Sequence, residues 1–194
     1  MDIDEVLVGT VSHILQYHNE VYKTNFKFQD IKDYDFWKLW GGTKEEAIKK
    51  VYGFYASSHF KELKPFPEAI ESINILRKEH ELIIVTARQA DIKEATYNWI
   101  NAYFPNSFSA IHFADDYEQI MGKKYKRKSS ICEDSGIELM LEDHPNCALE
   151  CANCGINTIL FSKAWNAALS HEKIIRTNSW PEALGAVKQL SQNL

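Results

Sequence analysis

Short apolar runs that alternate with helical patterns constrain the fold of this chain more than any other feature. Four such runs cover residues 81–85, 110–113, 137–141 and 157–161. Helical patterns flank them at residues 67–78, 91–104 and 146–153. Strands that are apolar throughout are buried on both faces, which is the usual state of a parallel sheet covered by helices. The sequence therefore predicts an α/β fold, with a parallel sheet and helices on both of its faces.

A second region, residues 10–65, has a helical pattern rich in aromatic side chains and no convincing strand. We interpret it as a small helical cap inserted after the first strand, with Pro65 and Pro67 marking the return to the sheet. This interpretation divides the chain into a core of residues 1–9 and 66–194 and a cap of residues 10–65.

The composition excludes several classes of protein. Lys and Arg number 22 against 27 Asp and Glu, and the resulting net charge of −5 argues against a nucleic-acid polymer as partner. No apolar run approaches the ~20 residues that span a bilayer, so no membrane partner is expected. The acidic start, Met-Asp-Ile-Asp-Glu, differs from the basic and then apolar pattern of a secretory signal. We expect a cytoplasmic protein, and the sequence indicates no particular oligomeric state.

Three cysteines and a histidine, at positions 144, 147, 151 and 154, invite comparison with a zinc site. Their spacings of three, four and three residues are those of one helix face. A helix rises ~15 Å over ten residues, so His144 and Cys154 cannot share one tetrahedral ion. We interpret the cysteines as small buried apolar side chains of a helix.

Polar residues follow the predicted strands, and ligands of an open parallel sheet bind at the carboxyl ends of its strands. The residues placed there are Asp2, Asp4, Thr86, Lys128, Glu142 and Asp143. Carboxylate oxygens are the ligands that Mg²⁺ prefers, while a hydroxyl and a lysine suit phosphate oxygens. One carboxylate can act as a nucleophile and another can protonate a leaving group. The set therefore predicts phosphoryl chemistry.

The order of these residues resembles the four motifs of the haloacid dehalogenase superfamily of phosphohydrolases. Several stretches also resemble the branch of cytosolic 5′(3′)-deoxyribonucleotidases; they read DIDEVL, DYDFWKLWGGTKEEAI, IVTARQ, LEDHPNCALECANCGI and LFSKAWN. The similarity covers nearly the whole chain. It implies a Rossmann-like core of the haloacid dehalogenase type with a small helical cap after the first strand.

The resemblance assigns roles to the acidic residues. Asp2 is the expected nucleophile that forms an aspartyl-phosphate, and Asp4 the general acid that later serves as the base. Asp2, Asp143 and the backbone carbonyl of Asp4 are expected to bind Mg²⁺. Glu142 is expected to join them, either directly or through water.

The resemblance also implies a phosphate-binding set of Thr86, Ala87, Arg88 and Lys128. Arg88 could alternatively cap the edge of the sheet. Lys124 or Lys126 could take the place of Lys128, which is preferred because the residues after it resemble the start of a helix leading into the run at 137–141.

Three aromatic residues of the predicted cap, Phe36, Trp37 and Trp40, have two interpretations. They could bind the substrate by stacking on a nucleobase, or they could form the core of the cap. The expected function is Mg²⁺-dependent hydrolysis of a small phosphorylated metabolite, with a (deoxy)nucleoside monophosphate favoured. The alternatives are a catalytically inactive module that binds a nucleotide or a protein partner, and a phosphomutase or phosphonatase on the same scaffold.

The sequence departs from the family pattern at three places, one of which is His144, which follows the acid pair where a small residue is common and could alter metal affinity. A run of apolar residues normally precedes the first aspartate and forms a central strand, but here only Met1 precedes Asp2. Either the chain is truncated or the residues that follow rebuild this strand. Glu5 also stands where many family members have glycine, which adds negative charge near the nucleophile.

Overall fold

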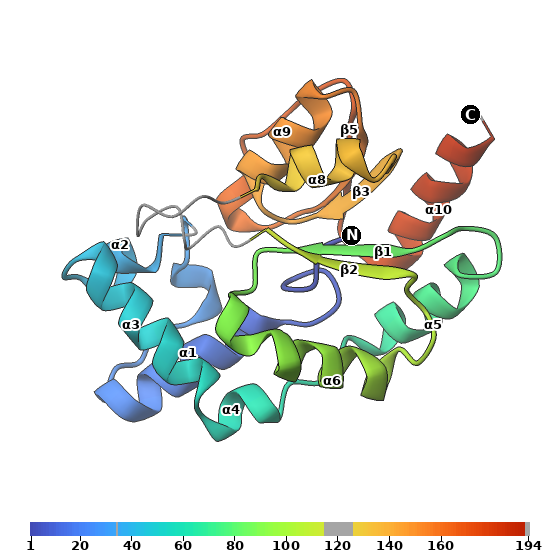
Figure 1. Ribbon diagram of the computed structural model, residues 1–194. Helices are drawn as coiled ribbons and strands as arrows, with labels where there is room; N and C mark the ends of the chain where they lie inside the picture. The colour runs from blue at the N-terminus through green and yellow to red at the C-terminus, as the bar shows by residue number, and fades with distance from the viewer. Residues whose placement is uncertain (34, 115–125, 193–194) are drawn as a thin grey trace.

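The computed structural model describes residues 1–33, 35–114 and 126–192 (Figure 1). Its strands are β1 (Ile83–Thr86), β2 (Ala110–Phe113), β3 (Leu139–Glu142), β4 (Asn157–Phe161) and β5 (Ile174–Thr177). Its α-helices are α1 (Thr10–Tyr22), α2 (Phe36–Trp40), α3 (Lys44–Tyr55), α4 (Ser58–Lys61), α5 (Pro67–Leu76), α6 (Lys93–Tyr103), α8 (Lys128–Asp134), α9 (Pro145–Asn153) and α10 (Trp180–Ser191). Short 3-10 helices are η1 (Phe28–Asp30), η2 (Ala90–Ile92) and η3 (Ala164–Asn166). Within the described ranges, no helix is both long enough and apolar enough to cross a membrane.

The strands pair in parallel and form two groups. β1 pairs with β2, while β3, β4 and β5 lie side by side in that order. The parallel α/β fold predicted from the sequence is therefore confirmed. β2 and β4 have the predicted bounds, β1 and β3 lie slightly later in the chain than the predicted runs, and β5 was not predicted.

The first two residues of the chain join the two groups of strands. The amino group of Met1 donates a hydrogen bond to the carbonyl oxygen of Ile83 at 2.7 Å, and Val85 N donates to Met1 O at 2.9 Å. On the other side, Asp2 N donates to Leu141 O at 2.9 Å. Met1 and Asp2 thus occupy the place of a central strand between β1 and β3.

The residues that follow Asp2 do not rebuild the family's first strand. Leu7 N donates to Ile3 O at 2.7 Å and Glu5 N donates to Val8 O at 2.7 Å, so residues 3–8 close a tight loop. The central position of the sheet therefore depends on Met1 and Asp2.

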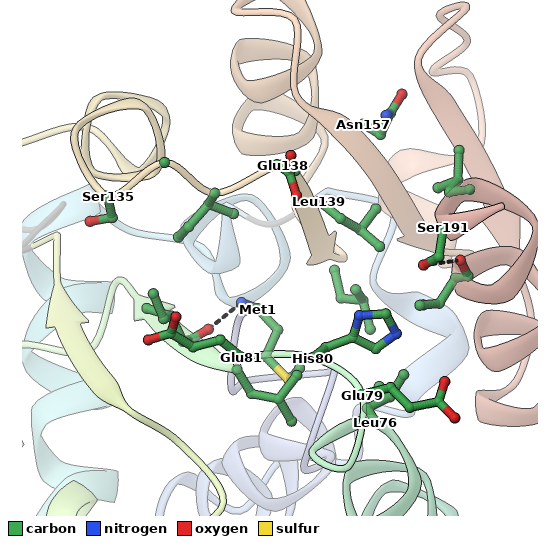
Figure 2. Close-up of a pocket in the computed structure, with 17 residues that line it drawn as sticks. Met1, Leu76, Glu79, His80, Glu81, Ser135, Glu138, Leu139, Asn157 and Ser191 are labelled. Carbon is green, nitrogen blue, oxygen red and sulfur yellow. Dashed lines mark hydrogen bonds between the residues drawn. The ribbon is translucent and has the colours of Figure 1, made fainter. Parts of the chain in front are cut away.

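A cavity of about 390 Å³ lies beside Met1, between the amino-terminal ends of β1 and β3 (Figure 2). Its lining includes Ile83, Leu139 and Leu76, and Val187 of α10. The amino group of Met1 is buried here, and this burial lowers its pKa.

Alternate residues of the central strands face two layers of helices. Val85 and Met140 pack with Cys132 of α8 and Cys151 of α9. Ile84 and its neighbours pack in the opposite layer with residues of α5, α6 and α10. Helices therefore cover both faces of the sheet. The buried Cys151 serves as a small apolar side chain of α9, as predicted, but Cys147 is half-buried and Cys154, which follows α9, is exposed, so the prediction is wrong for Cys154.

Helices α1 to α4 gather at one end of the molecule (Figure 1). The described part of residues 10–65 contains no strand, in agreement with the sequence. Phe54 and Ile31 of this segment are fully buried in the same apolar core as α5 and α10. After the helical segment, the chain meets the loop of residues 3–8 again at Phe66, whose N–H donates to Leu7 O at 2.9 Å. The division into core and cap at residues 9/10 and 65/66 stays a prediction.

Candidate active site

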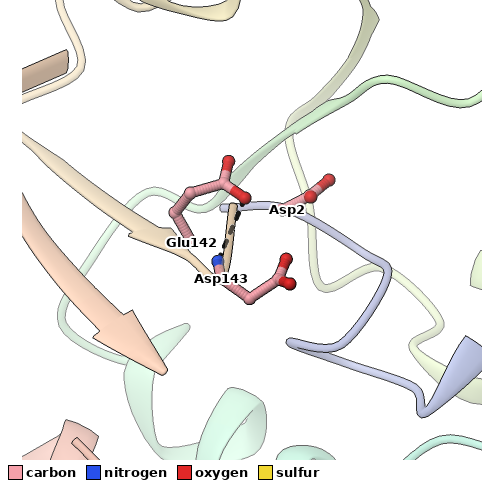
Figure 3. A group of neighbouring side chains, drawn as sticks. All are labelled: Asp2, Glu142 and Asp143. Carbon is pink, nitrogen blue, oxygen red and sulfur yellow. Dashed lines mark hydrogen bonds between the residues drawn. The ribbon is translucent and has the colours of Figure 1, made fainter. Parts of the chain in front are cut away.

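Three buried carboxylates from two parts of the chain meet at the carboxyl end of β3 (Figure 3). Asp2 belongs to the amino-terminal residues that pair with β1 on one side and with β3 on the other. Glu142 is the last residue of β3, and Asp143 follows it. One oxygen of each side chain lies within 4.8 Å of the others. The structure thus brings together the acidic residues that the sequence placed at strand ends.

Lys128, the first residue of α8, connects two of these carboxylates. Its Nζ lies 2.7 Å from Asp2 Oδ2 and 2.9 Å from Glu142 Oε2. Burial lowers the pKa of this ammonium group, but the two carboxylates outweigh burial and raise the pKa well above its usual value. Of the other lysines considered, Lys126 pairs with Asp134, and Lys124 lies outside the described residues.

Two oxygens of the acidic cluster have no hydrogen-bond partner within the described part of the chain. They are Asp2 Oδ1 and Asp143 Oδ1, and both are buried. Burial raises the pKa of Asp2 to about 7 against the opposing effect of Lys128. Burial, together with Glu142 and Asp2, raises the pKa of Asp143 well above its usual value. Buried, unpartnered carboxylate oxygens short of positive charge fit a hard divalent cation such as Mg²⁺.

The carboxylate of Glu142 is already engaged on both oxygens. Oε1 accepts hydrogen bonds from the backbone N–H groups of Asp143 and His144, both at 3.0 Å, and Oε2 accepts from Lys128. This arrangement holds Lys128 in place and fixes the turn after β3. It favours contact of Glu142 with a cation through water over direct contact.

Asp4 is held by two donors. Arg88 reaches its carboxylate through Nη2 at 2.8 Å and Nε at 3.1 Å, and the hydroxyl of Thr10 donates to the same carboxylate. Burial raises the pKa of Asp4, but Arg88 and Thr10 lower it by more, so the net shift is downward. The side chain of Asp4 remains 16% exposed and thus accessible.

The predicted phosphate-binding residues at the end of β1 differ in position. Thr86 is fully buried, and its hydroxyl accepts a hydrogen bond from the backbone N–H of Arg88 at 3.3 Å. Ala87 is half-buried beside it. The guanidinium of Arg88 points to Asp4 and lies over the rings of Phe60 and Trp99, 5.5 and 5.7 Å from their centroids. Arg88 therefore binds a carboxylate of the site in this structure.

Glu5 adopts a left-handed backbone conformation, with φ of 59°. Glycine adopts this conformation without steric cost, which explains why glycine suits this position. The side chain of Glu5 is buried, lies 3.0 Å from Lys163 Nζ and accepts from Val11 N at 2.9 Å. Lys163 is thus its ion-pair partner, but burial still raises the pKa of Glu5, and Glu5 contributes to raising the pKa of Asp143.

The aromatic residues of α2 have different surroundings. The ring of Trp40 lies between Phe36 and His18, with centroids 4.7 and 4.4 Å away and interplanar angles of 7° and 16°. Both faces of Trp40 are therefore covered, and Phe36 is buried against it. Trp37 is half-buried, lines a small cavity with Val51, and its indole nitrogen has no hydrogen-bond partner within the described ranges.

Sequence reasoning assigned no role to two residues that contact the site. Trp165 Nε1 donates to Asp143 Oδ2 at 3.0 Å, and Asn166 Nδ2 donates to the carbonyl oxygen of Asp143 at 2.7 Å. Both lie in η3, shortly after the carboxyl end of β4. Thr86 and Glu142 were selected because ligands bind at the carboxyl ends of parallel strands. Applying this criterion to β4 as well would have found Trp165 and Asn166.

Comparisons with known proteins show the family of the chain. The model of the family described as 5′ nucleotidase, deoxy (Pyrimidine), cytosolic type C protein matches residues 1–191. The chain belongs to this family. YqfW of Bacillus subtilis (strain 168) is 30% identical over 185 residues, covering 95% of this chain and 90% of YqfW. The 5′(3′)-deoxyribonucleotidase of Clostridium acetobutylicum is 26% identical over 198 residues, covering 100% of this chain and 96% of that protein.

The fold is also that of the haloacid dehalogenase superfamily. The structure of SP0104, a haloacid dehalogenase-like hydrolase from Streptococcus pneumoniae, has a TM-score of 0.66 to this chain at 14% identity. The match covers 96% of this chain and 95% of that one. The resemblance drawn from the sequence motifs is therefore confirmed, and the protein is a phosphatase that hydrolyses phosphomonoesters.

The raised pKa values of Asp2 and Asp143 predict a pH-dependent stability. A carboxyl group whose pKa is raised by folding stabilises the native state at low pH, and this stability is lost as pH rises through the folded pKa. In EDTA, the wild type should lose melting temperature relative to Asp143→Asn as pH rises above about 4, because only the wild type carries Asp143, whose pKa folding raises well above its usual value. Added Mg²⁺ should restore it. If the melting temperatures of the two proteins in EDTA change with pH by the same amount, the interpretation that the acidic cluster lacks positive charge is contradicted.

Proposed function

We propose that this protein is a Mg²⁺-dependent nucleotidase that hydrolyses (deoxy)nucleoside monophosphates through an aspartyl-phosphate on Asp2. The buried cluster of Asp2, Asp143 and Lys128 supports this proposal most directly, because two of its carboxylate oxygens lack partners and one cation neutralises only part of its charge. Membership of the nucleotidase family supports the class of substrate.

Asp2 would attack the phosphorus of the substrate with one carboxylate oxygen. A bond between this oxygen and phosphorus forms while the bond between phosphorus and the ester oxygen breaks. Lys128, 2.7 Å from Asp2, favours the ionised form of the nucleophile against the effect of burial and would offset the charge of the phosphoryl oxygens. The hydroxyl of Thr86, at the end of β1, would donate to one of these oxygens.

Asp4 would move the proton in both steps. As an acid it protonates the ester oxygen of the leaving alcohol. Because Arg88 and Thr10 lower the pKa of Asp4 and keep it ionised in the free enzyme, it would first accept this proton from the monoanionic phosphate ester and then pass it to the leaving oxygen. As a base it then takes a proton from the water that attacks the aspartyl-phosphate, which releases inorganic phosphate and restores Asp2. Arg88 and Thr10 fix the orientation of the Asp4 carboxylate for both transfers.

Asp2, Asp143 and the backbone carbonyl of Asp4 would hold Mg²⁺, with Glu142 in contact through water. When bound, Mg²⁺ supplies positive charge that stabilises the phosphoryl group in the transition state.

Trp37 is the aromatic residue of α2 that we propose for contact with the base of the substrate. Trp37 and Trp40 are both half-buried, and the indole nitrogen of each lacks a partner in the described ranges, so the contacts on the ring faces distinguish them. Trp40 is covered on both faces and is assigned to the core of the helical segment.

Replacing Asp2 with Asn is expected to reduce turnover by at least about 10³-fold, because an amide is a very poor nucleophile toward phosphorus. Release of inorganic phosphate from a panel of nucleoside monophosphates would measure it. Asp134→Asn, at an exposed carboxylate outside the cluster, should behave as wild type.

Three outcomes would contradict the proposal. Wild-type turnover by Asp2→Asn would exclude Asp2 as the nucleophile. Nucleotide binding without phosphate release by the wild type would favour an inactive binding module. Transfer of the phosphate to another position of the substrate, with no inorganic phosphate released, would favour a phosphomutase.

The two tryptophans of α2 should respond differently to truncation. Trp37→Ala should weaken the binding of a nucleoside monophosphate by ~1–3 kcal/mol, or roughly 5- to 150-fold, at nearly unchanged melting temperature. Trp40→Ala should instead destabilise the fold by about 3 kcal/mol, because it removes a ring packed on both faces. Hydrolysis of p-nitrophenyl phosphate by Trp37→Ala should persist. Early melting of Trp37→Ala with loss of both activities would exclude the stacking role.

A further inference from the structure

The short helix η3, which follows β4, holds Asp143 at two points. Trp165 Nε1 donates to one carboxylate oxygen, Oδ2, at 3.0 Å. Asn166 Nδ2 donates to the backbone carbonyl of the same residue at 2.7 Å and to that of Phe161 at 2.8 Å. The proposed chemical steps use neither Trp165 nor Asn166.

These contacts determine which oxygen of Asp143 is available. A carboxylate can rotate about its last bond, but a hydrogen bond to Oδ2 fixes that rotation. The other oxygen, Oδ1, is buried and has no hydrogen-bond partner in the described chain. An oxygen of Asp143 also belongs to the cluster with Asp2 and Glu142.

From this geometry we infer that Trp165 is a positioning residue for cation binding, which holds Asp143 so that Oδ1 is free for Mg²⁺. The inference rests on the proposed function for the presence of Mg²⁺. The indole N–H suits this task because it donates one hydrogen bond, accepts none and carries no charge. It therefore orients the carboxylate without reducing its negative charge and without competing as a ligand.

Asn166, which binds the backbone carbonyl of Asp143, is itself held by several hydrogen bonds. Asn166 is 1% exposed, and its Oδ1 accepts from Lys163 N and from Arg176 Nη1 of β5, both at 3.1 Å. Asn166 thus ties the backbone of Asp143 to β4 and β5.

Trp165 is also covered by the helical segment. The ring of Phe28, in η1, lies with its centroid 5.6 Å from that of Trp165, and Trp165 is 8% exposed. The indole is therefore fixed from the side of residues 10–65 as well as from the sheet.

The test is Trp165→Phe in the full chain, which removes the N–H donor and keeps an aromatic ring. Isothermal titration calorimetry with MgCl₂ should show an affinity lowered by about 10- to 100-fold, the effect typical of lost ligand-orienting contacts. The activity of the variant should recover at saturating Mg²⁺, which a general defect of the fold would not allow.

Trp180→Phe is the matched control. Trp180 is likewise buried, and its Nε1 donates at 3.0 Å to a backbone carbonyl, that of Val6, without contacting Asp143. Its loss should leave the Mg²⁺ affinity unchanged. If Trp165→Phe melts early, benzothienylalanine at position 165 repeats the test, because it keeps the bicyclic ring and replaces the N–H by sulfur.

The outcomes separate the two proposals. If the wild type binds no Mg²⁺ and releases no phosphate, the proposed function fails. If the wild type binds Mg²⁺ and Asp143→Asn abolishes binding, but Trp165→Phe binds like the wild type, only the positioning role fails. An equal loss of affinity in Trp165→Phe and Trp180→Phe would also overturn the positioning role.

Discussion

Backbone hydrogen bonds from Met1 to β1 and from Asp2 to β3 hold the two groups of strands together. They bring Asp2 next to the end of β3, where Glu142 and Asp143 lie. The same pairing brings the end of β1, with Thr86 and Arg88, to that edge of the sheet. Because residues 3–8 close a tight loop directly after Asp2, the position of the Asp2 carboxylate depends on these few bonds.

The charges around this edge are matched in pairs. Lys128 lies between Asp2 and Glu142, Arg88 binds Asp4, and Lys163 binds Glu5. Within the described ranges, Asp143 has no Lys or Arg at ion-pair distance and depends on the neutral donor Trp165. Burying a carboxylate without a positive partner costs free energy. The carboxylate of Asp143 is therefore the place in the site where a positive charge is lacking.

The strands β2 and β4 could be predicted from sequence because their runs are apolar and bounded by clear helix ends. β5 could not, since it is only partly buried and contains the exposed Arg176. The acidic cluster and Lys128 followed from strand order, which forces strand ends to one edge. The ion pair between Arg88 and Asp4 could not be predicted from strand order, because the two residues lie 84 positions apart in the sequence. Only the packing of the folded chain shows that Arg88 binds this carboxylate and not a phosphate. Packing alone also distinguishes Trp40 from Trp37.

The position of Arg88 connects the helical segment to the candidate site. The buried guanidinium lies over the ring of Phe60 in α4 and over the ring of Trp99 in α6, 5.5 and 5.7 Å from their centroids. Tilting α4 away would expose the contact with Phe60 to water and lose an attraction worth about 0.5–2 kcal/mol. Since the same guanidinium binds the carboxylate of Asp4, the packing of α4 also contributes to the orientation of that carboxylate.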